Sequence, residues 1–237
     1  MRSRDSQPRG YAVNLRSAPQ MREYAAIVER IRGDAPGRVL DWGCGWGQVT
    51  DMLLRAGVDV TAFDYRGADA VDGWAPLSVY PHIRAYISSD PVKLPFGDAS
   101  FDAVLSCGVL EHVGDPDASL RELRRILRPG GTLYVYKLPN RWSYLEKIAR
   151  AAGLYYHGQY PDDRLYTPRT ARELLERHGF AVEELGLANM LPLTLDFSFA
   201  ARPRATSAIW RANRALARVP GLNRLATNVE LIGRVPA

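Results

Sequence analysis

A glycine-rich loop between a short apolar strand and a helix constrains the fold of this chain most. The loop carries Gly43, Gly45 and Gly47, and it follows the apolar pair Val39 and Leu40. Glycine lets the backbone turn sharply and approach a ligand without obstruction by a Cβ atom. A strand, a glycine loop and a helix in this order predict a nucleoside-binding pocket, in which the helix amides favour a carboxylate or phosphate.

An acidic residue ends the next predicted strand. Residues 59–64 finish at Asp64, which follows Gly43 by 21 positions. A carboxylate at this place can accept hydrogen bonds from both ribose hydroxyls. Between the two strands, apolar residues at helical spacing predict a helix from position 49, with Gly57 as its C-cap.

Strand and helix signals alternate along the chain, which predicts a parallel sheet with helices on both faces. Asp115-Pro116 and Thr167-Pro168 each supply an N-cap and a first helical residue. The expected strands are 38–42, 59–64, 83–88, 101–106, 132–137, 181–187 and 227–234, and a leading helix is expected over 22–32.

The glycine spacing differs from that of dinucleotide-binding proteins. In G-x-G-x-x-G the third glycine comes one position later than Gly47 does here, and Asp41 stands two residues before the first glycine. This motif resembles motif I of class I S-adenosylmethionine-dependent methyltransferases of the small-molecule type. The resemblance covers about residues 36–137, through the run Asp90-Pro-Val-Lys-Leu-Pro-Phe, the closing Leu110-Glu-His112 and the segment 120–133.

The resemblance implies an α/β fold: a Rossmann-like, seven-stranded, mostly parallel sheet with helices on both faces and an antiparallel last strand pair. It also implies a single methyltransferase domain over residues 1–237. Within it we expect an N-terminal arm and helix (1–35), a cofactor-binding core (36–137) and two substrate-side insertions (138–166 and 189–226). Long insertions in a compact domain are commonly binding loops or lids.

The same resemblance implies which residues hold S-adenosylmethionine. Asp41, Gly43 and Gly45 would hold its methionine end, Asp64 its ribose, and Asp90 with Pro91 its adenine edge. Ser106, Cys107 and Gly108 would line the floor, and Gly47 and Tyr65 complete the set. Structural roles are the alternative: close helix packing at Gly47, core packing at Cys107 and a loop hydrogen bond at Asp41.

His112 is the candidate general base for an acceptor that must lose a proton, because it follows strand 101–106 and an imidazole titrates near neutrality. A hydrogen bond to a loop is the alternative role. In the insertion 138–166, the candidate acceptor contacts are Tyr155, Tyr156, His157 and Tyr160, which could instead anchor that segment to the core.

Motifs that the sequence lacks narrow the class of acceptor. Ser106-Cys-Gly-Val109 stands where amino-methylating nucleic-acid enzymes of this fold carry an Asp/Asn-Pro-Pro-aromatic motif, and Cys107 lacks the preceding proline of cytosine C5 enzymes. We therefore expect a small-molecule or a lipid- or glycan-linked acceptor, methylated on oxygen or carbon. An RNA methyltransferase, a non-catalytic cofactor-binding subunit and an NAD-dependent oxidoreductase remain alternatives.

The net charge of +5 is unevenly distributed, since residues 1–16 carry +3 and residues 201–237 carry +6. The segment Ser207 to Val219 has apolar residues on one helical face and arginines on another, which suits either peripheral membrane contact or an ordinary surface helix. The sequence shows no signal peptide, and two cysteines indicate reduced thiols in a cytoplasmic protein. The four histidines show no ligand-like spacing, so no metal site is expected.

Overall fold

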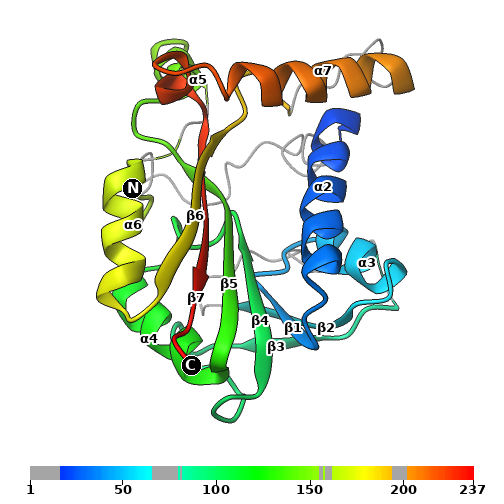
Figure 1. Ribbon diagram of the computed structural model, residues 1–237, viewed down its shortest axis with the longest axis vertical. Coiled ribbons are helices and arrows are strands. Elements are labelled where there is room, and N and C mark those ends of the chain that lie inside the picture. The colour runs from blue at the N-terminus through cyan, green and yellow to red at the C-terminus, as the bar shows by residue number, and fades with distance from the viewer. Residues whose placement is uncertain (1–16, 66–79, 81, 155–156, 158–161, 194–201) are drawn as a thin grey trace.

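The computed structural model describes residues 17–65, 80, 82–154, 157, 162–193 and 202–237 (Figure 1). Its sheet has seven strands in the order β3-β2-β1-β4-β5-β7-β6. The strands are β1 (Arg38–Trp42), β2 (Asp59–Tyr65), β3 (Ala85–Ser88), β4 (Phe101–Cys107), β5 (Leu127–Pro139), β6 (Ala181–Ala188) and β7 (Asn228–Arg234).

The five strands from β3 to β5 pair in parallel, whereas β7 is antiparallel to both β5 and β6. The helices are α2 (Ala18–Asp34), α3 (Gln48–Arg55), α4 (Pro116–Ile126), α5 (Tyr144–Ala151), α6 (Pro168–Arg177) and α7 (Pro203–Leu216), with a short 3-10 helix η2 (Leu222–Leu225). The expected seven-stranded, mostly parallel sheet with an antiparallel end is confirmed.

Two apolar layers hold the helices to the sheet. On one face α4 and α6 bury Leu120, Leu123 and Leu175 against the central strands, and on the other face α2 and α3 bury Ile31 and Leu53. Each of these side chains is at most 1% exposed. Burial of a leucine or isoleucine contributes about 1.5–3 kcal/mol, so these helices are fixed by the core and the strand ends are held in place.

The helix caps follow the sequence signals. The Asp115 side chain accepts a hydrogen bond from the Ala118 N–H at 2.8 Å, and Thr167 and Thr170 form a capping box. Helix α2 begins at Ala18, four residues earlier than expected, because Ser17 caps it and Pro19 suits its first turn. Strand β5 begins at Leu127 rather than 132, since Leu127 pairs with Phe101.

Helix α5 was not predicted from the sequence. Ser143 caps it through a hydrogen bond from the Glu146 N–H at 3.2 Å, but none of its own residues is buried. Tyr144 and Leu145 are partly buried and Ile148 is 56% exposed, so α5 packs only partly against the rest of the protein.

The carboxyl edge of the parallel strands is covered by the two insertions. Figure 1 shows α5 and α7 beyond the end at which β5 finishes, and α7 reaches the N-terminal end of α2. There the Arg22 guanidinium lies 4.4 Å from the centre of the Trp210 ring, and Asn213 accepts a hydrogen bond from the Leu191 N–H at 2.5 Å. Within the residues placed by the structure, no helix has the length and apolar character needed to cross a bilayer.

Candidate functional site

Strand register brings the glycine loop between the ends of two neighbouring strands. Trp42, the last residue of β1, pairs with Phe63 of β2 on one side and Ser106 of β4 on the other. The N–H groups of Gly43 and Cys44 both donate to the Phe63 carbonyl at 2.9 Å. The loop, the end of β2 and the end of β4 therefore form one continuous edge.

The three glycines of the loop all adopt the left-handed conformation, with φ of 78°, 51° and 83° at Gly43, Gly45 and Gly47. A Cβ atom at Gly43 would lie 2.4 Å from Val109 Cγ2, so this position also requires glycine for space. Beside Gly45 the nearest atom is the Gly43 carbonyl oxygen at 4.0 Å. The backbone at Gly45 is therefore open to a ligand on the side where a Cβ would stand.

Asp64, at the end of β2, is hydrogen-bonded to this loop. Its Oδ2 accepts a hydrogen bond from the Gly45 N–H at 2.6 Å, and its Oδ1 accepts one from the Tyr65 N–H at 2.7 Å. The carboxylate is 9% exposed, and burial raises its pKa against the lowering effect of these two donors. Each carboxylate oxygen has a second lone pair, so Asp64 can still accept two hydroxyl donors.

Asp41 lies beneath the same loop and is 2% exposed. Its Oδ2 accepts a hydrogen bond from the Thr50 hydroxyl of α3 at 2.5 Å, so the observed partner lies in the helix rather than in the loop that was expected. Burial, together with the nearby Asp64 charge, raises the pKa of Asp41 to about 6. Two buried carboxylates at one loop create a site that favours a positively charged ligand group.

The end of β4 supplies small side chains next to the loop. Ser106 is 1% exposed, and its hydroxyl oxygen has no hydrogen-bond partner among the residues placed by the structure. Burial raises the pKa of Cys107 and of Cys44 far above the usual thiol range, and both cysteines are free. A thiol held in its neutral form is a poor nucleophile, which argues against a cytosine-type role for Cys107.

Asp90 and Pro91 lie in an exposed turn two residues beyond β3, at the same edge. The Asp90 Oδ1 accepts hydrogen bonds from the Val92 and Lys93 N–H groups at 2.9 and 2.8 Å, and these donors lower its pKa. The Asp90 side chain therefore stabilises the turn. Its contact with an adenine ring stays a prediction.

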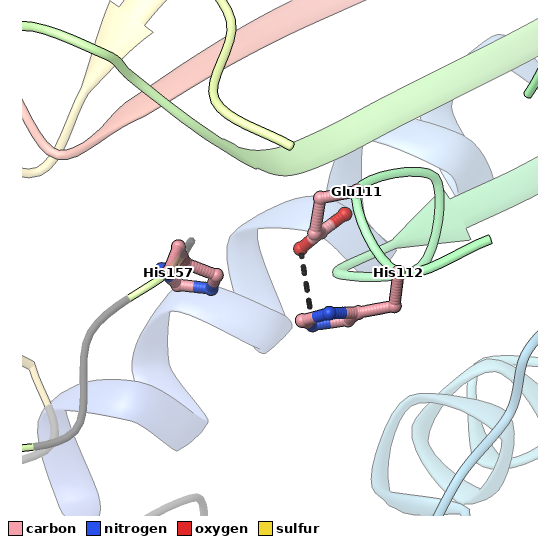
Figure 2. Close-up of side chains that lie close together, drawn as sticks. All are labelled: Glu111, His112 and His157. Carbon is pink, nitrogen blue, oxygen red and sulfur yellow. Dashed lines mark ion pairs between the residues drawn. The ribbon is translucent and has the colours of Figure 1, made fainter. Parts of the chain in front are cut away.

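His112 is paired with a carboxylate from the first insertion. Its Nδ1 lies 2.9 Å from Asp163 Oδ1, and the Asp163 side chain is only 3% exposed. On the other side its Nε2 lies 3.8 Å from Oε1 of Glu111, a 2%-exposed side chain whose pKa is raised by burial. Figure 2 shows the Glu111 carboxylate pointing toward the His112 ring.

His157 lies close to this pair. Its ring stacks on that of His112, with 5.7 Å between ring centres and 23° between ring planes. Its Nδ1 lies 2.7 Å from Glu146 Oε1. Burial lowers the pKa of His157, but the carboxylates of Glu146, Glu111 and Asp163 outweigh burial, so the net direction is upward.

The spacing of the histidines in the sequence predicted no group of ligands. This prediction is corrected, because the structure brings His112 and His157 together with Glu111. The expected acceptor contacts Tyr155, Tyr156 and Tyr160 lie outside the described residues. Sequence reasoning missed Glu111, Glu146 and Asp163. Only Glu111 had a signal, since it stands beside His112 in the Leu-Glu-His run.

A second group of charged residues was also missed. Lys137 adopts φ of 63° where the β5–β7 register shifts, and its Nζ lies 5.1 Å from the centre of the Tyr24 ring. On the adjacent strand, burial and the nearby Glu23 raise the pKa of Glu230 to about 8, against the effects of Lys137 and Arg214. A bulge at the end of a central strand commonly re-aims a side chain near a functional site.

Comparison with known proteins is consistent with this geometry. Residues 40–135 match the sequence model of the methyltransferase domain family. The chain is 34% identical over 145 residues to the demethylmenaquinone methyltransferase of Renibacterium salmoninarum, covering 57% of this chain and 58% of that protein. It is 39% identical over 109 residues to the ubiquinone biosynthesis O-methyltransferase of Xanthomonas oryzae pv. oryzae, covering 44% of each chain. The chain thus spans about half the length of these curated relatives.

Among solved structures, the fold is similar to that of the Burkholderia thailandensis 1,6-didemethyltoxoflavin-N1-methyltransferase. The TM-score is 0.58 at 22% identity, and the match covers 96% of this chain and 83% of that one. At this identity the similarity concerns the fold. Residues 40–135, which carry the glycine loop and the acid at the end of β2, match the methyltransferase domain family, and the named relatives support a class I S-adenosylmethionine-dependent methyltransferase.

Proposed function

We propose that this protein transfers a methyl group from S-adenosylmethionine to a small or lipid-linked acceptor, on oxygen or carbon. The observation that carries the proposal is the hydrogen bond from the Gly45 N–H to Asp64 at 2.6 Å. It joins the glycine loop to the acid that ends β2, and it leaves lone pairs on Asp64 for ribose hydroxyls. Two named relatives support this acceptor class. One is a ubiquinone biosynthesis O-methyltransferase, and the other is a demethylmenaquinone methyltransferase.

The residues present fit the cofactor. Asp41 and Asp64 place two buried carboxylates at the loop, which suits a ligand with positive charge, and the open side of Gly45 admits a ligand close to the backbone. Bound S-adenosylmethionine would supply a methyl group already activated by a positively charged sulfur. The protein then has to orient the acceptor and exclude water.

Deprotonation of a hydroxyl acceptor is assigned to the His112 side of the pocket. Asp163 fixes the orientation of the imidazole through Nδ1, which leaves Nε2 as the nitrogen on the Glu111 side. An imidazole oriented in this way by a buried carboxylate can act as a general base for the acceptor hydroxyl. Methylation of an acidic carbon, or of a phenol with a low pKa, depends less on the His112 imidazole, because such an acceptor loses its proton more readily.

Calorimetry tests the cofactor pocket. S-Adenosylmethionine and S-adenosylhomocysteine should bind saturably to the full chain, NAD should give no heat, and Asp64→Ala should weaken binding at least tenfold, since a hydrogen bond to a charged group is worth about 1.5–3 kcal/mol. Asp59→Ala, at the exposed start of β2, is the matched control. Heat with NAD and none with S-adenosylmethionine would overturn the proposal.

A second assay tests the acceptor class. Radiolabelled S-adenosylmethionine is incubated with the protein and either a panel of hydroxylated aromatic headgroups, with and without a prenyl tail, or total RNA. Label in the aromatic compounds supports the proposal. Label in RNA alone would favour the RNA alternative, and cofactor binding without transfer to any acceptor class would favour a non-catalytic subunit.

A further inference from the structure

We propose that Glu111, His112 and His157 hold one divalent transition-metal ion beside the cofactor pocket. Each residue offers one ligand atom, and these atoms all lie within 4.8 Å of one another. Figure 2 shows Glu111 and His112 on the same loop after β4, with His157 facing them from another segment. Two imidazole nitrogens and one carboxylate oxygen form a donor set that suits zinc and related ions.

The buried carboxylate is the first independent observation. Glu111 is 2% exposed, and its Oε2 has no hydrogen-bond partner among the described residues. A buried polar atom without a partner costs about 1–3 kcal/mol, and more when it is charged. A cation at this point would compensate that cost directly.

The outer partners of the two histidines are the second observation. Nδ1 of His112 lies 2.9 Å from Asp163, and Nδ1 of His157 lies 2.7 Å from Glu146. Glu146 is further anchored, because its Oε2 accepts the backbone N–H of His157 at 2.8 Å. Histidines that bind metals usually donate their other ring N–H to a carboxylate, which fixes the ring and its tautomer. Both histidines of this cluster have that arrangement.

The position of the cluster connects it to the pocket. A Cβ atom at Gly108, directly after β4, would lie 3.7 Å from Glu111 Oε1, and Val109 packs against Gly43 of the glycine loop. Zinc ligands at about 2.0–2.1 Å from the ion lie about 3.4 Å from one another in tetrahedral geometry. The side chains therefore have to close by roughly an ångström, which side-chain rotation of His112 and His157 can provide.

Three protein ligands leave one coordination position open, which is the arrangement of catalytic rather than structural zinc sites. An acceptor hydroxyl bound there would have a lowered pKa and would lose its proton to solvent. The ion would then occupy His112 Nε2 and take over the deprotonating role assigned to that histidine. This consequence rests on the proposed methyl transfer, whereas metal binding itself does not.

The test uses the full, untagged chain, stripped with a chelator and then titrated with Zn²⁺, Co²⁺ and Mg²⁺ in a calorimeter. We expect one equivalent of Zn²⁺ or Co²⁺ to bind and Mg²⁺ to bind at least a hundredfold more weakly, since magnesium prefers oxygen ligands. Glu111→Gln, His112→Asn and His157→Asn should each weaken Zn²⁺ binding at least tenfold. His82→Asn is the matched control, because His82 also contacts a carboxylate, Asp51, at 3.0 Å and should leave binding unchanged.

Two further readouts make the result decisive. Thermal melts and S-adenosylhomocysteine binding show whether each variant is folded, and the visible absorption of the Co²⁺ form reports its coordination. Zinc affinity that is equal in the parent, His112→Asn and His157→Asn would overturn the metal site, as would absence of zinc binding by protein that binds S-adenosylhomocysteine. Failure of the parent protein to bind S-adenosylhomocysteine would instead contradict the proposed function. Unchanged methyl transfer after chelation would overturn the role of the ion in the reaction.

Discussion

Asp163 lies 2.9 Å from the Nδ1 of His112, although 51 positions separate the two residues in the chain. The carboxylate comes from the first insertion, whereas the imidazole follows β4 of the core. The Asp163 side chain is only 3% exposed, whereas the His112 side chain is 38% exposed. The orientation of His112 is therefore set by a segment outside the cofactor-binding core.

Replacing Asp163 with asparagine should lower kcat about 10- to 100-fold, because the imidazole loses the carboxylate that orients it. The affinity for S-adenosylhomocysteine should change less than twofold, since Asp163 belongs to the first insertion and the cofactor is expected to bind at the glycine loop. Steady-state kinetics and calorimetry measure the two quantities. Asp162→Asn, one residue earlier, is the control, and an equal loss of kcat there would contradict a specific role for Asp163.

Gly43→Ala should be strongly destabilising. The new Cβ would lie 2.4 Å from Val109 Cγ2 in a backbone with φ of 78°, so both overlap and strain oppose it. Overpacking of this kind costs about 1–3 kcal/mol, in addition to about 1–2 kcal/mol for the left-handed conformation. Denaturant unfolding measures the loss.

Two further variants separate the causes in the glycine loop. Adding Val109→Ala to Gly43→Ala should recover the overlap part of the loss. Gly45→Ala meets its nearest atom at 4.0 Å, so it should show only the conformational cost. Equal stability of the two alanine variants would contradict the packing explanation.

Glu230 predicts a dependence of stability on pH. Its pKa is raised from 4.5 to about 8, first by burial and then by Glu23, while Lys137 and Arg214 oppose the shift. Protonated Glu230 therefore stabilises the fold fully below pH 4.5, and this contribution is lost as the pH rises to about 8. Glu230→Gln should raise the melting temperature at pH 8 and have little effect near pH 5. Glu183→Gln, in an exposed ion pair with Arg234, should show no such rise, and a parallel shift of both variants at every pH would be inconsistent with this account.

The segment Ser207 to Val219, most of it in α7, suits either peripheral membrane contact or an ordinary surface helix. Its apolar residues Ile209 and Leu216 are partly buried, while Arg211 and Arg218 are exposed. If these arginines meet an anionic surface, Arg211→Glu with Arg218→Glu should reduce sedimentation with phosphatidylserine vesicles at least fivefold, given about 1 kcal/mol per basic residue. Arg169→Glu with Arg172→Glu on α6 is the control. Equal sedimentation of the two double variants would leave α7 as an ordinary surface helix.

The sequence predicted the sheet and the position of the glycine loop well because both depend on local patterns. Apolar strands that alternate with capped helices require a parallel sheet, and glycines followed by Asp64 specify a loop and its acid by spacing alone. The strand ends were less accurate. Strand β5 begins five residues early because pairing of Leu127 with Phe101 continues the ladder through a segment rich in turn residues.

The histidine cluster could not be predicted, because it depends on the path of the first insertion. His157 and Asp163 reach His112 only after the chain has passed through α5, a helix without a buried residue. A local pattern within α5 does not specify where the chain runs after it. In α7, the buried Asn213 likewise stands where an amphipathic pattern expects an apolar residue, because its amide oxygen accepts the Leu191 N–H.

The division of the cluster between core and insertion has an evolutionary consequence. Glu111 and His112 follow a core strand, whereas Glu146, His157 and Asp163 belong to the segment 138–166. If the insertion contacts the acceptor, as the sequence predicts, it can diverge under selection for new acceptors while the glycine loop stays constrained. A chimaera that exchanges residues 138–166 between two relatives would inherit its acceptor preference from the donor and its cofactor affinity from the recipient.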